Sequence, residues 1–225
     1  MSASQTFATD GAVHFRAALS DAAIEPLRTF ADQALGQRPG ARLSAETAFL
    51  AELLSAKGLI GRFAAELAGP DVRPVRFLLF DKSDASNWAV PWHQDRTIAV
   101  KARVDVPGYG PWSTKDGRVH VEPPVDVLSR MVTLRVHLDH VDAHNAPLKV
   151  ALGTHTRGVV LAHDVRAVIE AQNIEPCLAE AGDIWAYSTL ILHASDRADP
   201  GRRRRVLHID YADFDLPGGL AWLGV

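Results

Sequence analysis

The sequence has almost no cysteine, because Cys177 is the only one among its 225 residues. No disulfide can therefore form within the chain, and a metal site built from several thiolates is excluded. The sequence also lacks a long apolar run, since no stretch reaches the ~18 residues that a membrane-spanning helix needs. The first fifteen residues contain neither Lys nor Arg. We therefore expect no secretory signal and no membrane partner, and a cytoplasmic location.

The chain also lacks a large excess of either charge, because 24 basic residues nearly balance 27 acidic ones and the formal net charge is −3. A general nucleic-acid binder would show a basic excess, so we expect no nucleic-acid partner. Hydrophobic residues make up 47% of the chain, which is enough for a buried core. The length predicts a single domain that spans residues 1–225.

The first part of the chain has helical spacing of apolar residues, which predicts a helical flank over about residues 20–70. Ser20 can cap a first helix that carries Ile24, Leu27, Phe30 and Leu35, although Pro26 leaves its beginning open. A second helix is expected after Ser44. A third is predicted by Ile60, Phe63, Ala64 and Leu67, before the stop signal Gly69-Pro70.

From residue 72 onward the apolar period changes to two, which predicts strands. The sharpest alternation runs from Val132 to Leu138. Helices followed by strands favour an α+β fold, mainly β, with an antiparallel sheet. Residues 101–128 show no clear period and contain four prolines, so we expect an irregular insert there, with the role of a lid. Other predicted strands are 75–80, 148–152, 184–187, 190–195 and 203–211, and one short helix is expected at 164–171.

The ten histidines are the most informative feature of the composition. A facial-triad iron site needs two imidazoles and one carboxylate on one side of the metal. His93 and Asp95 have the His-x-Asp spacing that places both side chains on one side of an extended segment. The signal is weak alone, because ten His and nineteen Asp give about one such pair by chance. Pairs at 137/139 and 208/210 lie inside regular strands, whereas His93 follows an irregular stretch rich in polar and aromatic residues.

Four motifs follow one another in the chain, at residues 10–28, 92–95, 146–155 and 182–211. Together they resemble the phytanoyl-CoA dioxygenase-like family of Fe(II)/2-oxoglutarate-dependent oxygenases, over nearly the whole chain. Residues 10–28 resemble the opening strand and helix of that family. Trp92-His93-Gln94-Asp95 resembles its metal motif, and residues 146–155 resemble a segment that usually ends in Pro-Gly-Ser/Thr-His, with Leu152 in place of the proline. Gly182-Asp183 and the residues from His193 to Tyr211 resemble its closing part.

The resemblance implies a fold, a cofactor set and roles for particular residues. The fold would be a double-stranded β-helix (jelly-roll, cupin-like) with the N-terminal helices packed on one side. His93, Asp95 and His193 match the Fe(II) ligands, and are thereby the catalytic residues. Arg204 matches the residue that binds the distal carboxylate of 2-oxoglutarate, and Ser195 matches a hydrogen-bond donor to it. With O2, such an enzyme hydroxylates an unactivated C–H bond of a small molecule and releases succinate and CO2. An intact Asp95 favours hydroxylation over halogenation, because related halogenases have a small residue there.

Strand parity separates Arg204 from the other members of the run Arg202–Arg205. Leu207, Ile209 and Tyr211 share a face with Arg205 and have the character of packing residues, so Arg204 is expected on the polar face that looks into the site. The remaining arginines are expected to be surface charge. By the same parity Thr133 and Arg135 would face the cosubstrate, although a solvent-facing strand would carry the same pattern.

The substrate itself does not follow from the sequence. Aromatic residues bracket the metal motif and the insert, and core packing would explain them as well as a substrate pocket. The insert also carries residues that could bind an anionic substrate, although a solvated loop would look the same: Arg103, Lys115, Arg118 and His120. The substrate could be an acyl-CoA or a small free metabolite. The sequence does not determine the oligomeric state either. The candidate substrate residues are Trp88, Trp92, Trp112 and His137.

Two other functions remain open at this point. A non-catalytic jelly-roll could bind a ligand or metal, although such a protein would be expected to lose part of the triad or Arg204. A zinc hydrolase could use the same two His and one Asp with an activated water, but it has no need of Arg204.

Overall fold

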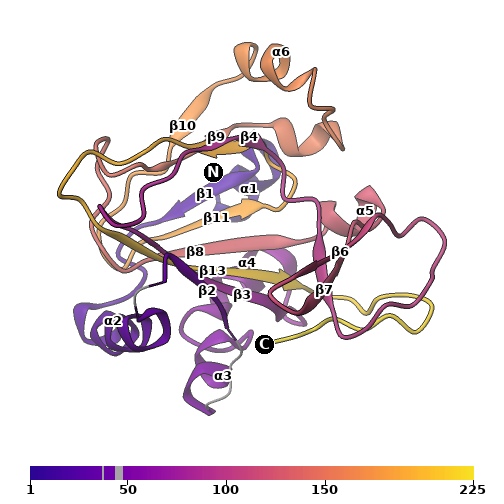
Figure 1. Ribbon diagram of the computed structural model, residues 1–225, viewed down its shortest axis with the longest axis horizontal. Coiled ribbons are helices and arrows are strands. Elements are labelled where there is room, and N and C mark those ends of the chain that lie inside the picture. Colours follow the sequence, from indigo (N-terminus) through magenta and orange to yellow (C-terminus); the bar gives the residue numbers. More distant parts are fainter. Residues whose placement is uncertain (37, 44–47) are drawn as a thin grey trace.

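The protein was analysed as a computed structural model, which describes residues 1–36, 38–43 and 48–225. Within these residues the strands form three sheets, and every strand pairing is antiparallel. Figure 1 shows helices α2 and α3 below the largest sheet and the smaller sheets above and beside it. The mixed α+β character and the antiparallel pairing predicted from the sequence are therefore confirmed.

The largest sheet has six strands and forms the centre of the molecule. In order across the sheet they are β1 (Ala12–Phe15), β11 (Ile184–Ser188), β8 (Val132–His137), β13 (Arg204–Ala212), β3 (Arg73–Lys82) and β2 (Gly40–Leu43). All residues of β8 and β13 are buried. Since both faces of these strands are covered, the alternative of a solvent-facing strand at 132–138 is wrong.

One face of this sheet packs against the N-terminal helices. Apolar side chains of β8 and β13, such as Leu134 and Ile209, form one core cluster with Ile24 and Leu54 of the helices. The helices are α1 (Ala3–Asp10), α2 (Asp21–Leu35), α3 (Ala48–Leu54) and α4 (Gly61–Ala68). Three of them correspond to the predicted helices, and α2 continues through Pro26. The predicted start at Ser44 lies outside the described residues.

A four-stranded sheet covers the opposite face of the six-stranded sheet and carries some of the candidate site residues. Its order is β10 (Ile174–Pro176), β9 (Leu148–Ala151), β12 (His193–Ser195) and β4 (Val90–His93). The predicted strand at 190–195 is shorter, because β12 begins only at His193. A 3-10 helix η1 (Thr154–Arg157) and helix α6 (Val165–Glu170) connect β9 to β10.

The insert at 101–128 is more regular than the sequence analysis expected. It contains a hairpin of β6 (Trp112–Lys115) and β7 (Arg118–Val121) that pairs with β5 (Ile98–Val100), followed by α5 (Val125–Ser129). The hairpin turns at Asp116 and Gly117, whose φ angles are 50° and 73°. An Asp-Gly pair is a strong signal for a two-residue turn of this kind. The expectation of an irregular segment therefore holds for residues 101–111 and is wrong for the hairpin and α5.

The arginine run also departs from expectation. Arg205 is only 8% exposed, and its guanidinium pairs with Asp139 at 2.7 Å and with Asp32 of α2 at 3.0 Å. Arg203 pairs with Asp32 and with Asp81 of β3. These two arginines are therefore not simple surface charge, because they join α2 to strands β13 and β3 of the central sheet.

In the described part of the chain, none of the helices is both long enough and apolar enough to cross a membrane.

Candidate functional site

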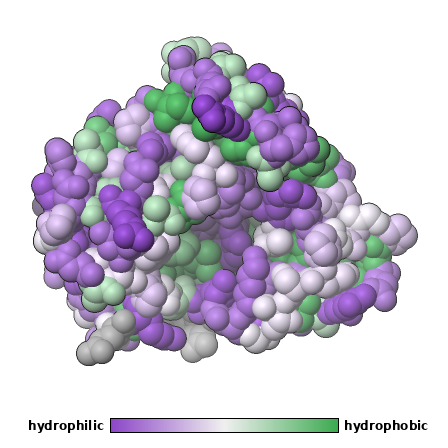
Figure 2. All heavy atoms as spheres, turned by 45° about the horizontal axis from the view of Figure 1, so that its top comes forward, coloured by the Kyte–Doolittle hydropathy of each residue, from purple (hydrophilic) through white to green (hydrophobic). Residues whose placement is uncertain are grey.

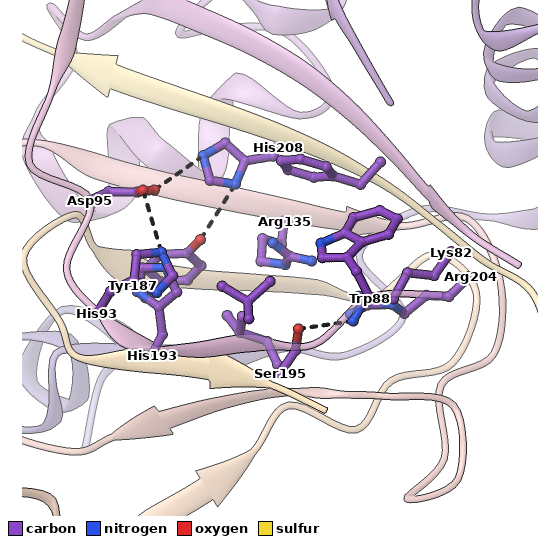
Figure 3. A pocket seen from close by; sticks show the side chains of 13 residues that line it. Lys82, Trp88, His93, Asp95, Arg135, Tyr187, His193, Ser195, Arg204 and His208 are labelled. Atoms are coloured by element: carbon purple, nitrogen blue, oxygen red, sulfur yellow. Dashed lines mark hydrogen bonds and ion pairs between the residues drawn. The ribbon is translucent and has the colours of Figure 1, made fainter. Parts of the chain in front are cut away.

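The backbone register of two strands brings two histidines together. In the pairing of β12 with β4, His193 lies directly opposite His93, and the centres of the two rings are 4.3 Å apart. Asp95 follows β4 by two residues and turns toward both rings (Figure 3). One ligand atom from each of these three residues lies within 4.8 Å of the others, a spacing that one metal ion can bridge. We call His93, Asp95 and His193 the His–Asp–His cluster.

Both histidines of this cluster are held in the tautomer that a metal ligand needs. Nδ1 of His93 lies 2.8 Å from the carbonyl oxygen of Pro91, and Nδ1 of His193 lies 3.0 Å from that of Ile191. Because a carbonyl oxygen only accepts hydrogen bonds, Nδ1 carries the proton in each ring and Nε2 keeps its lone pair. Burial lowers the pKa of His193 to about 4, so its ring is neutral at pH 7.

The carboxylate of Asp95 is oriented by a buried ion-pair network. Its Oδ2 lies 3.3 Å from NH2 of Arg76, while its Oδ1 lies 3.9 Å from Nε2 of His93. Arg76 is itself anchored, because its Nε lies 2.6 Å from Oδ2 of the buried Asp210. Burial raises the pKa of Asp95, but the charges of Arg76 and the surrounding histidines outweigh it and hold that pKa far below its usual range. Asp95 is thus ionised, with one oxygen bound by Arg76 and the other directed toward the histidines.

A cavity of about 110 Å³ extends from the cluster between the two larger sheets. Its other end is lined by three cationic side chains, Lys82, Arg135 and Arg204, which we call the cationic cluster (Figure 3). All three are at most 5% exposed. Within residues 1–36, 38–43 and 48–225, none of them forms an ion pair with a carboxylate.

Burial makes these charges costly in the absence of an anion. Nε and NH1 of Arg204 and Nε of Arg135 have no hydrogen-bond partner in the described chain. Burial and the neighbouring charge of Arg135 lower the pKa of Arg204 to about 9. Burial and the charges of Arg204 and Arg135 lower the pKa of Lys82 to about 7. Unpaired buried charges are unfavourable unless a ligand of opposite charge compensates them, so this end of the cavity is built for an anion.

Some of the residues singled out in the sequence line this cavity and others do not. Ser195, Arg135 and Trp88 line it together with Arg204, and Oγ of Ser195 accepts a hydrogen bond of 3.0 Å from Nζ of Lys82. Thr133 does not line it, and its hydroxyl donates a hydrogen bond of 2.8 Å to Asp210.

Three of the candidate substrate residues lie outside the cavity lining. Trp92 is half-buried on β4, and Trp112 packs against the core cluster of the three-stranded sheet. His137 is fully buried on β8 with neither ring nitrogen hydrogen-bonded within the described residues. Burial and the charges of Arg135 and Arg204 lower the pKa of its ring.

Sequence reasoning missed several residues of the site. Lys82 and Arg76 lie on β3. The apolar alternation of this strand identified the residues that face the core, but not these two. His208 was set aside as part of a regular strand, yet its ring lines the cavity, with Nε2 3.9 Å from Oδ2 of Asp95 and Nδ1 3.4 Å from the hydroxyl of Tyr187. The parity that places Arg204 toward the site also places His208 there, so the signal was present.

A second cavity of about 440 Å³ adjoins the first and shares Phe80, Trp88, Asp95 and His208 with it. It is bounded on its far side by β2 and by the turn of the β6–β7 hairpin. Figure 2 shows that one face of the molecule is hollowed near its middle, with hydrophilic residues inside the hollow.

Solved structures with the same fold are found at low sequence identity. EctD from S. alaskensis in its apoform has a TM-score of 0.70 at 16% identity, over 93% of this chain and 75% of that chain. The non-heme alpha ketoglutarate dependent carbocyclase SnoK from nogalamycin biosynthesis has 0.70 at 16%, over 95% and 83%. AviO1 from Streptomyces viridochromogenes Tue57 has 0.57 at 22%, over 96% of each chain. These likenesses show that the chain shares their fold.

Comparison with curated protein sequences finds no match. The sequence profile of the phytanoyl-CoA dioxygenase (PhyH) family matches residues 7–206, which include the His–Asp–His cluster and the cationic cluster. On this match, the chain belongs to the phytanoyl-CoA dioxygenase family.

Proposed function

We propose that the protein is a Fe(II)- and 2-oxoglutarate-dependent dioxygenase that hydroxylates an unactivated C–H bond of a small molecule. The observation that carries the proposal is the combination of the His–Asp–His cluster and the unpaired cationic cluster in one cavity. Family membership supports the same chemistry. EctD is described with bound Fe in one structure and with 2-oxoglutarate and 5-hydroxyectoine in another.

The His–Asp–His cluster fits an iron ion. Two neutral imidazoles and one ionised carboxylate are the donor set of a facial triad, which leaves further positions open for other ligands. The hydrogen bonds from Nδ1 of His93 and His193 to backbone carbonyls fix both rings with Nε2 free. Arg76 holds one oxygen of Asp95 and so favours binding through the other.

The cationic cluster fits the distal carboxylate of 2-oxoglutarate. The guanidinium of Arg204 can bind a carboxylate through two parallel hydrogen bonds, and two of its nitrogens lack a partner in the described chain. Ser195 and Lys82 lie beside it and add two more donors. Within the cationic cluster, Arg135 is the member on the side of the His–Asp–His cluster, from where it can bind the cosubstrate along its length (Figure 3).

When bound, iron and 2-oxoglutarate would supply the oxidation, in which O2 and the cosubstrate are consumed and succinate and CO2 are released. The residues of the chain orient the cosubstrate, keep it away from water and direct the substrate to the metal. SnoK is described as a carbocyclase and SnoN as an epimerase, so the fold accommodates several outcomes. Hydroxylation is the outcome we propose here, and the intact Asp95 favours it over halogenation.

The same proposal covers the architecture. The six-stranded and four-stranded sheets would be the two halves of a double-stranded β-helix, with the cavity between them. Residues 1–225 would form a single domain, with the β6–β7 hairpin as a lid at the mouth.

The two rival functions account for less of the site. A zinc hydrolase would use the His–Asp–His cluster but would leave Lys82, Arg135 and Arg204 without a role. A non-catalytic protein that binds only a ligand would not need two histidines fixed in the tautomer that binds metal, and one that binds only a metal would not need the cationic cluster. Both rivals leave the adjoining pair of clusters unexplained.

A turnover assay tests the proposal directly. Protein loaded with Fe(II) is incubated with 2-oxoglutarate and O2, and succinate is measured. We expect slow succinate release without substrate. Asp95→Ala and His93→Ala should lower this rate by more than ~100-fold, because loss of a residue that only supports a metal ligand already costs ~10- to 100-fold.

The control variant for this assay is His137→Ala, which removes a buried histidine outside the cavity lining. We expect this variant to keep the activity of the parent protein. If His137→Ala abolishes succinate release while His93→Ala does not, the wrong histidines have been assigned. No succinate release combined with no anaerobic binding of 2-oxoglutarate to the iron-loaded protein would overturn the proposal.

A further inference from the structure

The second cavity lies where a substrate of the proposed reaction must bind. It reaches Asp95 and His208 at its inner end and opens toward β2 and the β6–β7 hairpin. Its volume of about 440 Å³ lies within the ~300–1,000 Å³ that is typical of small-molecule sites. The cavity is therefore large enough for a small molecule that reaches the His–Asp–His cluster at Asp95.

The walls of this cavity divide into an apolar and a polar part. Leu78, Phe80 and Trp88 offer apolar surface near the inner end. Three cationic side chains, Arg42, Arg76 and Lys115, supply the polar part together with Asp116. An occupant that uses both parts has an apolar body and a charged group.

The three cations differ in whether a carboxylate already neutralises them. Arg76 is bound by Asp95 and Asp210, and Arg42 forms an ion pair with Asp116. Lys115 donates a hydrogen bond of 3.1 Å to the hydroxyl of Thr97, and among the described residues it has no carboxylate partner. Lys115 is therefore the cation of this cavity that is free to bind an anionic group.

The position of Lys115 is fixed by the hairpin that carries it. Lys115 is the last residue of β6, next to the Asp116-Gly117 turn. That turn is joined to β2 by the Arg42–Asp116 ion pair and by a hydrogen bond of 3.1 Å from NH2 of Arg118 to the carbonyl of Arg42. Lys115 is an exposed residue; desolvation of its ammonium and the charge of Arg76 lower its pKa, and the charge of Asp95 acts in the opposite direction.

We propose that the second cavity binds the substrate and that this substrate carries one anionic group, a carboxylate or a phosphate monoester, which Lys115 binds. The proposal rests on the proposed function, since it places the substrate beside the iron ligands. The apolar part of the substrate packs against Leu78, Phe80 and Trp88, while its reacting carbon lies toward Asp95.

A binding experiment with three matched probes tests this. Hexanoate, hexyl phosphate and the uncharged hexanamide are titrated by ligand-observed NMR into anaerobic protein loaded with Fe(II) and 2-oxoglutarate, so that the cosubstrate occupies the cationic cluster. We expect at least one anionic probe to bind at least ~10-fold more tightly than hexanamide, and Lys115→Met to remove that advantage, because a hydrogen bond to a charged group typically contributes that much. The two anionic probes distinguish a carboxylate from a phosphate.

Two further variants serve as controls. Lys115→Arg keeps the charge and should keep the preference for the anionic probe. Lys101→Met removes an exposed lysine near β5 that does not line the cavity, and it should bind all probes as the parent does. Equal binding of hexanamide, failure of both anionic probes to bind, or binding that Lys115→Met leaves unchanged would each overturn the proposal.

Failure of this inference can be told from failure of the proposed function. The titrations are repeated on Arg204→Met without 2-oxoglutarate, where anion binding at the cationic cluster is weakened. Binding that depends on Lys115 should persist there. Loss of succinate release would count against the proposed function alone, whereas probe binding independent of Lys115 would count against the substrate site alone.

Discussion

The two ends of the cavity between the sheets handle buried charge in opposite ways. At the His–Asp–His cluster, Asp95 is bound by Arg76, and Arg76 is bound by Asp210. At the cationic cluster, Lys82, Arg135 and Arg204 lie together and the described chain offers no carboxylate to pair with them. Charges are balanced within the protein at the first end and left unbalanced at the second.

The difference indicates what each end is organised to bind. A preformed and internally paired donor set binds a metal without reorganisation, because its ligands are already oriented. An unpaired group of buried cations is unfavourable for folding, and an anionic ligand recovers that cost on binding. The first end therefore depends on the precision of its ion pairs, and the second depends on the total charge of its occupant.

The largest effect is expected when the unbalanced end loses Arg204. Arg204→Met should weaken 2-oxoglutarate binding on the order of 100-fold, because two hydrogen bonds between charged groups are lost. The same variant should not lower the thermal midpoint of the cosubstrate-free protein, since it removes a buried charge whose Nε and NH1 have no partner in the described chain. Anaerobic calorimetry and thermal unfolding measure the two quantities. A variant that loses stability and keeps its affinity would contradict this comparison.

A smaller effect is expected when Arg76 is replaced at the end of the cavity where the charges are balanced. Arg76→Lys keeps the charge but loses the planar group that joins Asp95 to Asp210, so the affinity for Fe(II) should fall ~10- to 100-fold. Competition with a chromogenic chelator measures it. The matched control is Arg73→Lys on the same strand, because Arg73 pairs with the exposed Asp215 and does not line the cavity that holds the His–Asp–His cluster. Equal iron affinity in all three proteins would show that Arg76 does not position Asp95.

The smallest effect is a pH dependence at Lys82. Its pKa of about 7 in the free protein means that the ammonium loses its proton as the pH rises through neutrality. A bound dianion would raise that pKa, so binding above pH 7 takes up a proton, and the affinity for 2-oxoglutarate should fall by up to ~10-fold per pH unit there. Calorimetry in buffers of different ionisation enthalpy measures the proton uptake. Lys82→Met should show a flat profile between pH 7 and 8.5, and an equally flat profile in the parent protein would exclude the role of Lys82.

The sequence was sufficient for those features that depend on local periodicity. Alternation at Val132–Leu138 predicted β8, and i, i+3, i+4 spacing predicted α4. Strand parity separated Arg204, which lines the cavity, from Arg205, which lies on the side of Leu207 and Ile209. These inferences succeed because side-chain direction within a strand is fixed by the backbone alone.

Features that depend on distant neighbours could not be inferred in this way. Lys82 ends a strand of apolar alternation, and nothing near it in sequence indicates that its ammonium is buried beside Ser195. Arg76 could be recognised as part of the site only once Asp95 and Asp210 lay beside it. Arg205 was misjudged for the same reason, since its partners Asp139 and Asp32 come from other elements. A buried charge can be recognised only from its ion-pair partners, and the tertiary structure brings these partners to it.

The pairing of β12 with β4 has a consequence for how this chain could vary in length. His193 is opposite His93 because of backbone hydrogen bonds, so their separation is set by strand register and not by the number of residues between them. Insertions or deletions in connecting segments such as the β6–β7 hairpin, outside the strands that pair with β12 or build the central sheet, would leave the two imidazoles in place. A shift of one residue within β12 would instead turn the His193 ring to the opposite face of the sheet. An engineer could therefore exchange the hairpin to change what the second cavity accepts, provided that three residues, His193 to Ser195, keep their register.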